Sequence, residues 1–245
     1  MLASELRQYD RGWGVRTPDL NRLWTLNQLC ITSPATFDEI VALAEDHQND
    51  LPFRHVNVDH DSTGRAVERA FTEAGWKQDR ELLMVLDADA DRSVDTTAVV
   101  ELSEEQMTGL MKRWWAEEFP VLVDDDELDQ FVNYNRREGK LWSESAFGVL
   151  DEDGVPLAIT KARAQGTTGW VEDVYTAAEA RGRGYARMLV THVTELLRAA
   201  ECDFIFIIAD DNDWPKTLYS KIGYRPVGYV HTFHLDLRPL QPVET

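Results

Sequence analysis

The sequence predicts an α/β protein with a mixed, twisted sheet, and two observations carry this prediction. Helix and strand patterns alternate along the 245 residues, as they do when helices cover the faces of a sheet. The uninterrupted apolar run 204–209 is typical of a strand that is covered on both faces. The long amphipathic helix that leads into it is apolar at Leu189, Val193, Leu196, Leu197 and Ala200.

The composition limits the class of protein. Hydrophobic residues make up 43% and charged residues 28% of the chain, which is ordinary for a soluble globular protein. No apolar run reaches the roughly 18 residues of a membrane span, and residues 1–14 lack the apolar core of a secretory signal. We therefore expect a cytoplasmic protein, in which Cys30 and Cys202 are small buried hydrophobes and form no disulfide framework.

The charge balance is strongly acidic. Lys and Arg number 25 against 44 Asp and Glu, giving a net charge of −19. Such a chain repels nucleic acid and anionic lipid, so we expect neither as a partner. The excess favours a cationic substrate, although solubility alone also explains it.

A polar, acidic stretch, 87–97, separates two segments that each carry strand and helix signals. We predict a first domain over 1–90, a linker over 91–97 and a second domain over 98–245. In the second, a capping box at 103–106 starts a helix, Gly154 closes a hairpin turn and Gly223 ends a helix. The expected strands are 98–102, 146–150, 155–162, 170–176, 204–209 and 224–237, with helices from 103, over 126–137, from 185 and over 214–222.

The first segment echoes the second half of this plan. Residues 71–76 align with residues 219–224, each six ending a helix before a new strand. Upstream, 37–47 matches the long helix and 53–59 matches the apolar strand. We interpret residues 1–90 as half of a duplicated fold.

The most informative segment lies between the strand ending at 176 and the helix from 185. Glycines let the backbone approach an anion closely, and a helix start offers unpaired N–H groups with partial positive charge. Basic side chains add full charges, so the segment predicts a pyrophosphate site; a Gly-Arg turn that merely caps a helix is the alternative. The residues are Arg181, Gly182, Arg183, Gly184, Tyr185, Ala186 and Arg187.

Two motifs then resemble one family. Arg181-x-x-Gly184-x-Ala186 is similar to the Q/R-x-x-G-x-G/A signature of the GNAT acetyltransferase superfamily. Downstream, Asn212, Leu218, Tyr219, Gly223 and Tyr224 resemble the N-x5-L-Y-x3-G-F/Y helix of that family. The resemblance covers 98–237 and implies a GNAT acyl-coenzyme A N-acyltransferase fold, preceded by a partial, non-catalytic GNAT-like domain over 1–90.

The resemblance also implies a reaction and its substrates. Acetyl-coenzyme A would donate its acetyl group to a primary amine, in a small molecule or a peptide, by direct attack in a ternary complex and without a metal. The pantetheine arm would pair with the backbone of Val174, Tyr175 and Thr176, whose N–H groups would stabilise the oxyanion. Asn212 and the residues from 181 to 187 would bind the coenzyme.

Two proton transfers accompany this chemistry. An amine of pKa about 10 is mostly protonated at pH 7, so a base must remove a proton before attack. Glu172 and Asp173 are the candidates, and because adjacent strand residues point to opposite faces only one can face the substrate; we prefer Glu172. Both could instead serve the fold or pair with substrate charge. Tyr219 resembles the general acid that protonates the leaving thiolate, or it is a core aromatic; its counterpart in the first segment is Phe71.

Other features are weaker. Trp114, Trp115 and Phe119 either form one wall of the acceptor site or pack in the core. The chain could be a monomer or a homodimer, and the alternative function is a non-catalytic acyl-coenzyme A-binding sensor or interaction module. A metal site is not expected at His47, His55, Asp59 and His60, which lack the spacing of metal ligands and fit a solvated surface better. Two histidines of the closing strand could line the acceptor pocket, although a structural role is favoured: His231 and His234.

Overall fold

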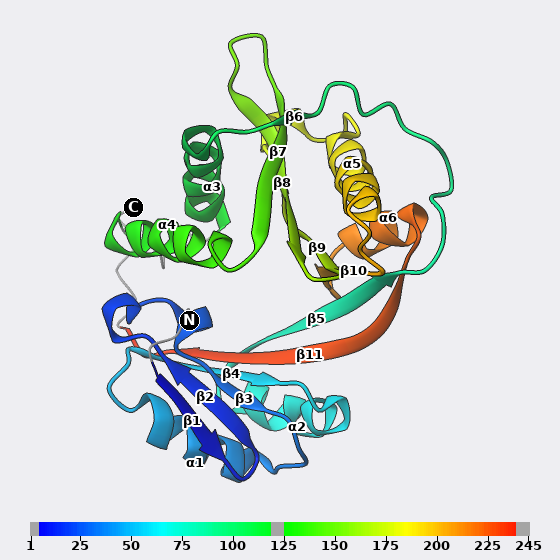
Figure 1. Cartoon of the computed structure of the whole chain (residues 1–245). Helices are drawn as coiled ribbons and strands as arrows, with labels where there is room; N and C mark the ends of the chain where they lie inside the picture. Colours follow the sequence, from blue (N-terminus) through cyan, green and yellow to red (C-terminus); the bar gives the residue numbers. More distant parts are fainter. Residues whose placement is uncertain (1–4, 119–124, 239–245) are drawn as a thin grey trace. The chain divides into compact units, whose positions relative to one another are not determined.

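The computed structural model describes residues 5–118 and 125–238 and confirms the α/β class (Figure 1). The chain divides into two compact units. The first takes in residues up to Glu81, Asp129–Tyr134 and the residues from Gly228 on; the second takes in Leu82–Leu128 and Asn135–Val227. These boundaries differ from the predicted ones because two long strands, β5 (Lys77–Leu86) and β11 (Tyr224–Asp236), each belong partly to both units.

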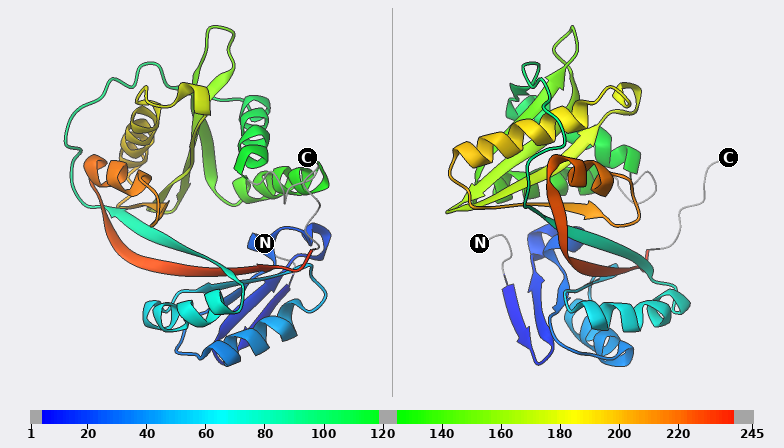
Figure 2. Two further views of the ribbon diagram at one scale, coloured as in Figure 1. Left: turned by 180° about the vertical axis from the view of Figure 1, so that it is seen from behind. Right: turned by 90° about the vertical axis from the view of Figure 1, so that its right-hand side faces the viewer.

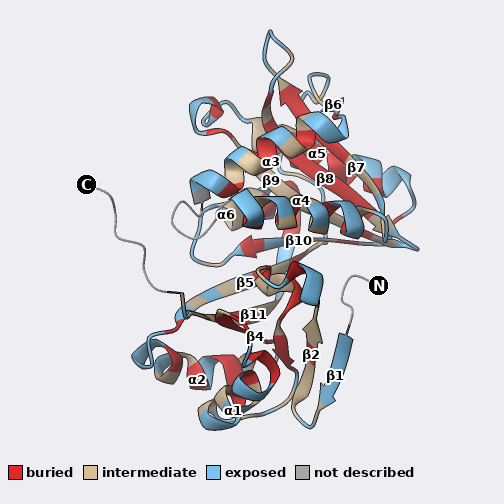
Figure 3. Ribbon diagram, turned by 90° about the vertical axis from the view of Figure 1, so that its left-hand side faces the viewer, coloured by how far each residue is buried: buried red, intermediate tan, exposed pale blue. Residues whose placement is uncertain are grey.

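The first unit is a sheet in the order β1-β2-β3-β4-β11, with α1 and α2 beside it. Only β3 and β4 pair in parallel; the β1–β2, β2–β3 and β4–β11 pairs are antiparallel. β1 is exposed along nearly its whole length, as an edge strand can be (Figure 3). The elements are β1 (Glu5–Tyr9), β2 (Gly12–Arg16), two 3-10 turns (Pro18–Leu20, Trp24–Leu26), β3 (Leu29–Ile31), α1 (Phe37–Gln48), β4 (Phe53–Val58) and α2 (Asp61–Glu73).

The core of the first unit is apolar and aromatic. A capping box starts α1, with the Thr36 hydroxyl accepting from Glu39 N–H and the Glu39 carboxylate accepting from Thr36 N–H. The helix then turns Ile40 and Ala44 onto the sheet. The other members of this core are Leu29, Ile31, Val56, Val58, Val67, Phe71, Trp76 and Phe233.

The second unit is a mixed sheet in the order β5-β10-β9-β8-β7-β6. β9 and β10 pair in parallel, while the β6–β7, β7–β8 and β8–β9 pairs are antiparallel. Helices α3 and α4 lie on one side of β7–β9 and helices α5 and α6 on the other (Figure 2). The elements are β6 (Val100–Glu101), α3 (Glu104–Glu118), α4 (Asp125–Gly139), β7 (Ser143–Leu150), β8 (Pro156–Gln165), β9 (Thr168–Thr176), a 3-10 turn (Ala178–Ala180), α5 (Tyr185–Ala199), β10 (Phe204–Asp210) and α6 (Pro215–Ile222).

Several local predictions are confirmed. Ser103 and Gln106 form the expected reciprocal capping box. Gly154 and Gly223 adopt positive φ values of 80° and 108°, as a hairpin turn and a helix C-cap require. Cys30 and Cys202 are free and buried. Among the described helices, none is both long and apolar enough to cross a membrane.

Two details differ from the predictions. β10 is not covered on both faces: Ile205, Ile207 and Ala209 are buried, whereas Phe204 and Ile208 are exposed by 44% and 37%. Apolar residues therefore alternate between a packed face and an open face. The expected closing strands after Gly223 form one thirteen-residue strand, β11.

Candidate functional site

The loop between β9 and α5 has the backbone of an anion site. Gly182 and Gly184 adopt φ values of 76° and 84°, which are strained for other residues, and nothing lies within 4 Å of where a Cβ would stand on either one. Gly184 is the N-cap of α5 and no side chain caps that end. The first N–H groups of α5 are thus available to an anion.

The three predicted arginines lie differently around this loop. Arg181 and Arg183 are exposed, and each donates to a nearby backbone carbonyl, of Thr176 and Glu179 respectively. Arg187 is buried and donates to the Asp91 carboxylate at 2.7 Å. Its charge is therefore balanced within the protein by the segment before β6, whereas neither Arg181 nor Arg183 forms an ion pair with a described carboxylate.

Strand β9 leaves its parallel partner just before the loop. The pairing with β10 runs from Thr168 to Val171 and stops there, although β9 continues to Thr176. Because the two strands separate, the backbone groups of Val174, Tyr175 and Thr176 on that side are not used by β10. That is the arrangement in which an extended ligand can add to a strand edge.

A β-bulge interrupts the other side of β9. Ile159 pairs with Tyr175 and Lys161 pairs with Glu172, so two residues of β9, Asp173 and Val174, oppose one residue of β8. Asp173 has a φ of 53°, one of two positive values among the described non-glycine residues. Strained backbone of this kind clusters at functional sites.

The bulge corrects the expectation that only one of the two adjacent carboxylates faces a given side. Glu172 contacts Arg163 and Asp173 contacts Lys161 at 2.6 Å. Lys161 and Arg163 are two residues apart on β8 and lie on one face. The left-handed conformation of Asp173 therefore turns both carboxylates to the same side of the sheet.

Burial and charge shift the protonation of this pair. The pKa of Glu172 lies well above its ordinary value, first because of burial and next because of the neighbouring Asp173 carboxylate, despite the opposing effect of Arg163. A carboxyl group with a raised pKa can exchange a proton nearer to neutral pH than an ordinary one.

The buried cations under the pair were missed by the sequence reasoning. The side chains of Lys161 and Arg163 are both 0% exposed. Lys161 also donates to Asn135 of α4. The sequence did contain a signal: Lys161 and Arg163 alternate with apolar residues in the strand 156–165. Because a charge that points into a core needs a partner, this pattern predicts buried ion pairs.

Tyr219 lies on α6, which packs against α5 and β10. Its ring is buried, and burial raises its pKa above the ordinary value. No described residue forms a hydrogen bond with its hydroxyl, in contrast to Tyr224, whose hydroxyl pairs with Thr194 at 2.8 Å. Asn212 is exposed in the loop before α6, where its N–H donates to Asp210.

The predicted acceptor wall is only partly described. Trp114 stacks on Tyr175 at 5.3 Å, and the Tyr175 hydroxyl donates to Glu117 at 2.6 Å. Burial, and then this carboxylate, raise the pKa of Tyr175 to about 12. Trp115 is buried in the core, and Phe119 lies outside the described residues.

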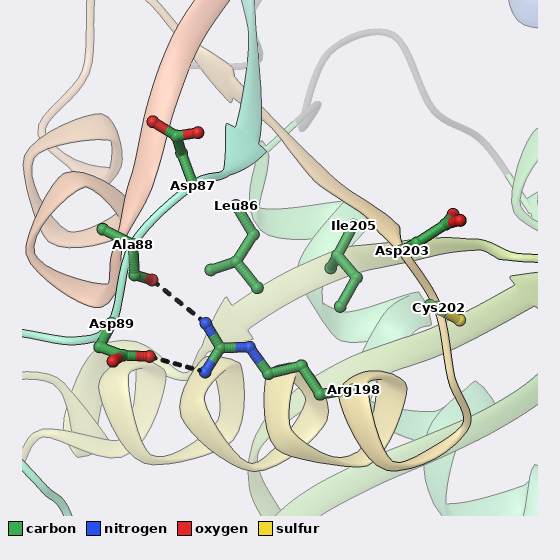
Figure 4. Close-up of a pocket in the computed structure, with 8 residues that line it drawn as sticks. All are labelled: Leu86, Asp87, Ala88, Asp89, Arg198, Cys202, Asp203 and Ile205. Carbon is green, nitrogen blue, oxygen red and sulfur yellow. Dashed lines mark hydrogen bonds and ion pairs between the residues drawn. The ribbon is translucent and has the colours of Figure 1, made fainter.

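A separate pocket of about 420 Å³ lies near the other end of α5 (Figure 4). Arg198 crosses it and donates to Asp89 and to the Ala88 carbonyl. Arg198 lies fourteen positions beyond Gly184 on the helix, roughly 20 Å, so this pocket is not part of the Gly182–Gly184 loop. Within residues 5–118 and 125–238, no three His, Cys, Asp or Glu side chains are grouped so that they could hold a metal ion.

The fold has many known counterparts. A conserved protein of unknown function from Staphylococcus epidermidis is similar over 96% of this chain and 94% of its own, with a TM-score of 0.71 at 15% identity. A GCN5-related N-acetyltransferase from Kribbella flavida covers 95% and 90%, with a TM-score of 0.58 at 16% identity. One from Sphaerobacter thermophilus covers 84% and 69%, with a TM-score of 0.58 at 15% identity.

These likenesses show a GNAT fold that extends over most of the chain, including the N-terminal unit. The sequence matches no curated protein. Residues 109–224 match the acetyltransferase (GNAT) family, a span that holds the bulge, the glycine loop and Tyr219. Over residues 109–224, the chain is therefore similar in sequence to the GNAT acetyltransferase family.

Proposed function

We propose that this protein transfers an acetyl group from acetyl-coenzyme A to a primary amine. One observation carries the proposal: β9 separates from β10 after Val171, bulges at Asp173 and then leads directly into the Gly182–Gly184 loop. An open strand edge, a carboxylate pair and an anion site thus follow one another within thirteen residues of sequence. The GNAT family in general uses acyl-coenzyme A donors, which have an extended arm and a diphosphate.

The donor would be held mainly by backbone. Amides at Gly182, Gly184 and Tyr185 would bind the diphosphate, with Arg181 and Arg183 adding charge. The groups of β9 from 174 to 176 would pair with the pantetheine arm and stabilise charge on the thioester oxygen. Asn212, with its exposed side chain, would complete the coenzyme site. Arg187 is left out because Asp91 already holds it.

The chemistry then needs two proton transfers. The ammonium of the acceptor loses a proton to Glu172, and the amine attacks the thioester carbonyl. The C–S bond breaks as the amide forms, and Tyr219 donates its proton to the departing thiolate; the second proton that the attacking nitrogen loses then returns to the Tyr219 oxygen. The absence of a described partner for the Tyr219 hydroxyl supports this role, since a proton donor must be free to reach its acceptor.

The acceptor class and the setting belong to the same proposal. A small-molecule or peptide amine fits a protein of net charge −19, because a cationic acceptor is attracted and nucleic acid or an anionic membrane surface is repelled. Two buried free cysteines support a reducing cytoplasmic setting.

The test is thiol release from acetyl-coenzyme A with a panel of amines, with the mass of the product as confirmation. We expect release that depends on an amine and that falls in Tyr219→Phe. Tyr224→Phe is the matched control: Tyr224 is also a buried tyrosine and its hydroxyl pairs with Thr194, so its removal should cost stability and spare turnover. If the protein binds acetyl-coenzyme A but releases no thiol with any amine, the proposed enzyme is wrong and a non-catalytic acyl-coenzyme A sensor is favoured.

A further inference from the structure

One buried arginine links three elements of the second unit. The Arg163 side chain is 0% exposed, and each of its three nitrogens contacts a different carboxylate. Nε donates to Glu144 of β7 at 2.5 Å, Nη2 to Glu138 of α4 at 2.8 Å, and Nη1 to Glu172 of β9. The Trp170 ring packs against the guanidinium with its centroid 5.1 Å from Cζ.

This arrangement is a costly way to stabilise a fold. Removing four charged groups from water costs several kcal/mol for each ion, and well-packed apolar residues of similar volume often do as well or better. Three carboxylates around one cation also leave an excess of negative charge. Buried charge that does not maximise stability is typical of sites where the position and protonation of one group matter.

Within the cluster, Glu172 differs from its neighbour. Asp173 has a cation of its own, Lys161, at 2.6 Å. Glu172 has only a share of Arg163, through a single carboxylate oxygen, and its side chain remains 23% exposed. The guanidinium thus fixes the orientation of Glu172 while part of the carboxyl group stays accessible.

We infer that Arg163 is a positioning residue for Glu172: by dividing its three nitrogens among Glu138, Glu144 and Glu172, it holds the Glu172 carboxyl at the bulge and neutralises it only in part. The catalytic consequence rests on the proposed acetyl transfer, in which Glu172 accepts the proton of the amine. A base that is held in place but only partly neutralised keeps more of its affinity for a proton than one with a full ion pair.

The charged groups that face Glu172 support this inference. Burial and then Asp173 of its own strand raise its pKa. Glu138 of α4 acts in the same direction, and Arg163 and Lys161 of β8 act against it. Glu144 of β7 acts indirectly, because it occupies the Nε of the same guanidinium. Changing how many carboxylates share Arg163 should therefore change how strongly Glu172 holds its proton.

The experiment makes two measurements. Carbon-13 NMR follows the titration of the Glu172 carboxyl in the substrate-free full chain, and steady-state kinetics give the pH profile of kcat with an amine that the protein acetylates. In Glu144→Gln, Arg163 is shared by two carboxylates, so the Glu172 midpoint and the acidic limb of kcat should fall together by about one pH unit. In Arg163→Lys, the ammonium cannot make three planar contacts, so both should rise and kcat should drop more than KM changes.

Arg54→Lys is the matched control. Arg54 is a buried arginine of the first unit with one carboxylate partner, Glu45, at 2.7 Å. This change should lower stability and leave the titration of Glu172 unmoved. If Arg163→Lys does not fold, Glu144→Gln decides alone, and a Glu172 midpoint that stays in place in the folded variant overturns the inference.

The two proposals fail in different ways. Midpoints that shift as expected in a protein that acetylates no amine would support the positioning by Arg163 and overturn the proposed acetyl transfer. Acetylation with an acidic limb that is the same in wild type, Glu144→Gln and Arg163→Lys would support the transfer and overturn the positioning role.

Discussion

The two units share a helix–glycine–strand segment but place different side chains on it. In the first, α2 ends at Glu73, and Gly75 with φ 85° lies between it and β5; in the second, α6 ends at Ile222, and Gly223 with φ 108° lies between it and β11. The residue four before each glycine is a buried aromatic. Phe71 packs against Phe37, Trp76 and Phe233 and is fully enclosed. Tyr219 carries a hydroxyl at the matching position.

The difference continues in the polar groups that each unit buries. The first unit holds a histidine pair, the buried His55 and the half-buried His234, with their Nδ1 atoms 3.2 Å apart. The second buries two cations, Lys161 and Arg163, and surrounds them with mostly half-buried carboxylates beside a strained strand. A shared helix end therefore does not make a site. The candidate chemistry lies where a strand departs from regular pairing, and the first unit has no counterpart to the Gly182–Gly184 loop among its described residues.

The glycine pair gives the strongest test of this contrast. Gly184→Val and Gly75→Val both place a β-branched residue at φ near 85° with open space around it, so each should lower the unfolding free energy by about 1–3 kcal/mol. Only Gly184→Val should disturb the Gly182–Gly184 loop, which we propose binds the diphosphate. Losing two charge-assisted hydrogen bonds of about 2 kcal/mol each predicts a fall in kcat/KM for acetyl-coenzyme A of about 10³-fold.

Denaturant unfolding and steady-state kinetics check this pair of variants together. Equal losses of kcat/KM in Gly184→Val and Gly75→Val would mean that both changes act through general destabilisation. The proposed role of the Gly182–Gly184 loop in donor binding would then be wrong.

The aromatic pair gives the next largest effect. Tyr219→Phe removes the proposed proton donor and should lower kcat by about 10²-fold with little change in stability. The reverse change, Phe71→Tyr, puts a hydroxyl among apolar rings and should cost about 1–3 kcal/mol of unfolding free energy. A Tyr219→Phe protein with normal kcat would make the two positions equivalent core aromatics.

The features that could be predicted from the sequence are those set by short-range chemistry. Ser103 and Gln106 cap a helix, Gly223 ends one, and the loop from 181 to 184 needs only its own glycines. The common face of Glu172 and Asp173 could not be predicted, because the bulge exists only against β8. Nor could the unit boundaries, which depend on the long-range partners of β5 and β11.

The same limit applies to the buried cations. Arg163 lies just beyond the strand predicted over 155–162, and its three carboxylates come from positions 138, 144 and 172 on three different elements. The sequence shows each of these charges singly. Only tertiary packing shows that they share one guanidinium.

The histidine pair predicts how acid affects the first unit. Burial lowers the pKa of His55 to about 3 and that of His234 to about 4. Unfolded histidines bind protons below about pH 6.5, so the stability that the neutral pair contributes is present above that pH and lost as the pH falls towards 4. At pH 5 the loss should be about 2 kcal/mol for each histidine.

Urea unfolding between pH 8 and pH 5 measures this loss. Stability should respond little to these two groups above pH 7, and His234→Gln should reduce the slope below pH 6.5 by about one proton. An unchanged slope would show that His234 is not held neutral in the folded protein.

Glu172 of the second unit predicts the opposite dependence of stability on pH, and a smaller change in the unfolding free energy. Because the pKa of Glu172 is raised in the folded state, the stability it contributes is present at low pH and is lost as the pH rises through that pKa. Glu172→Gln imitates the protonated form, so it should match wild type in acid and exceed it at alkaline pH. The gain in unfolding free energy should stay below the change that the histidine pair causes, since Arg163 compensates part of the charge and the Glu172 side chain is 23% exposed.

A Glu172→Gln protein that is less stable than wild type at high pH would mean that the ion pair with Arg163 outweighs burial. Glu172 would then be an ordinary structural anion, and the contrast between the two units would rest on the glycine loop and Tyr219 alone.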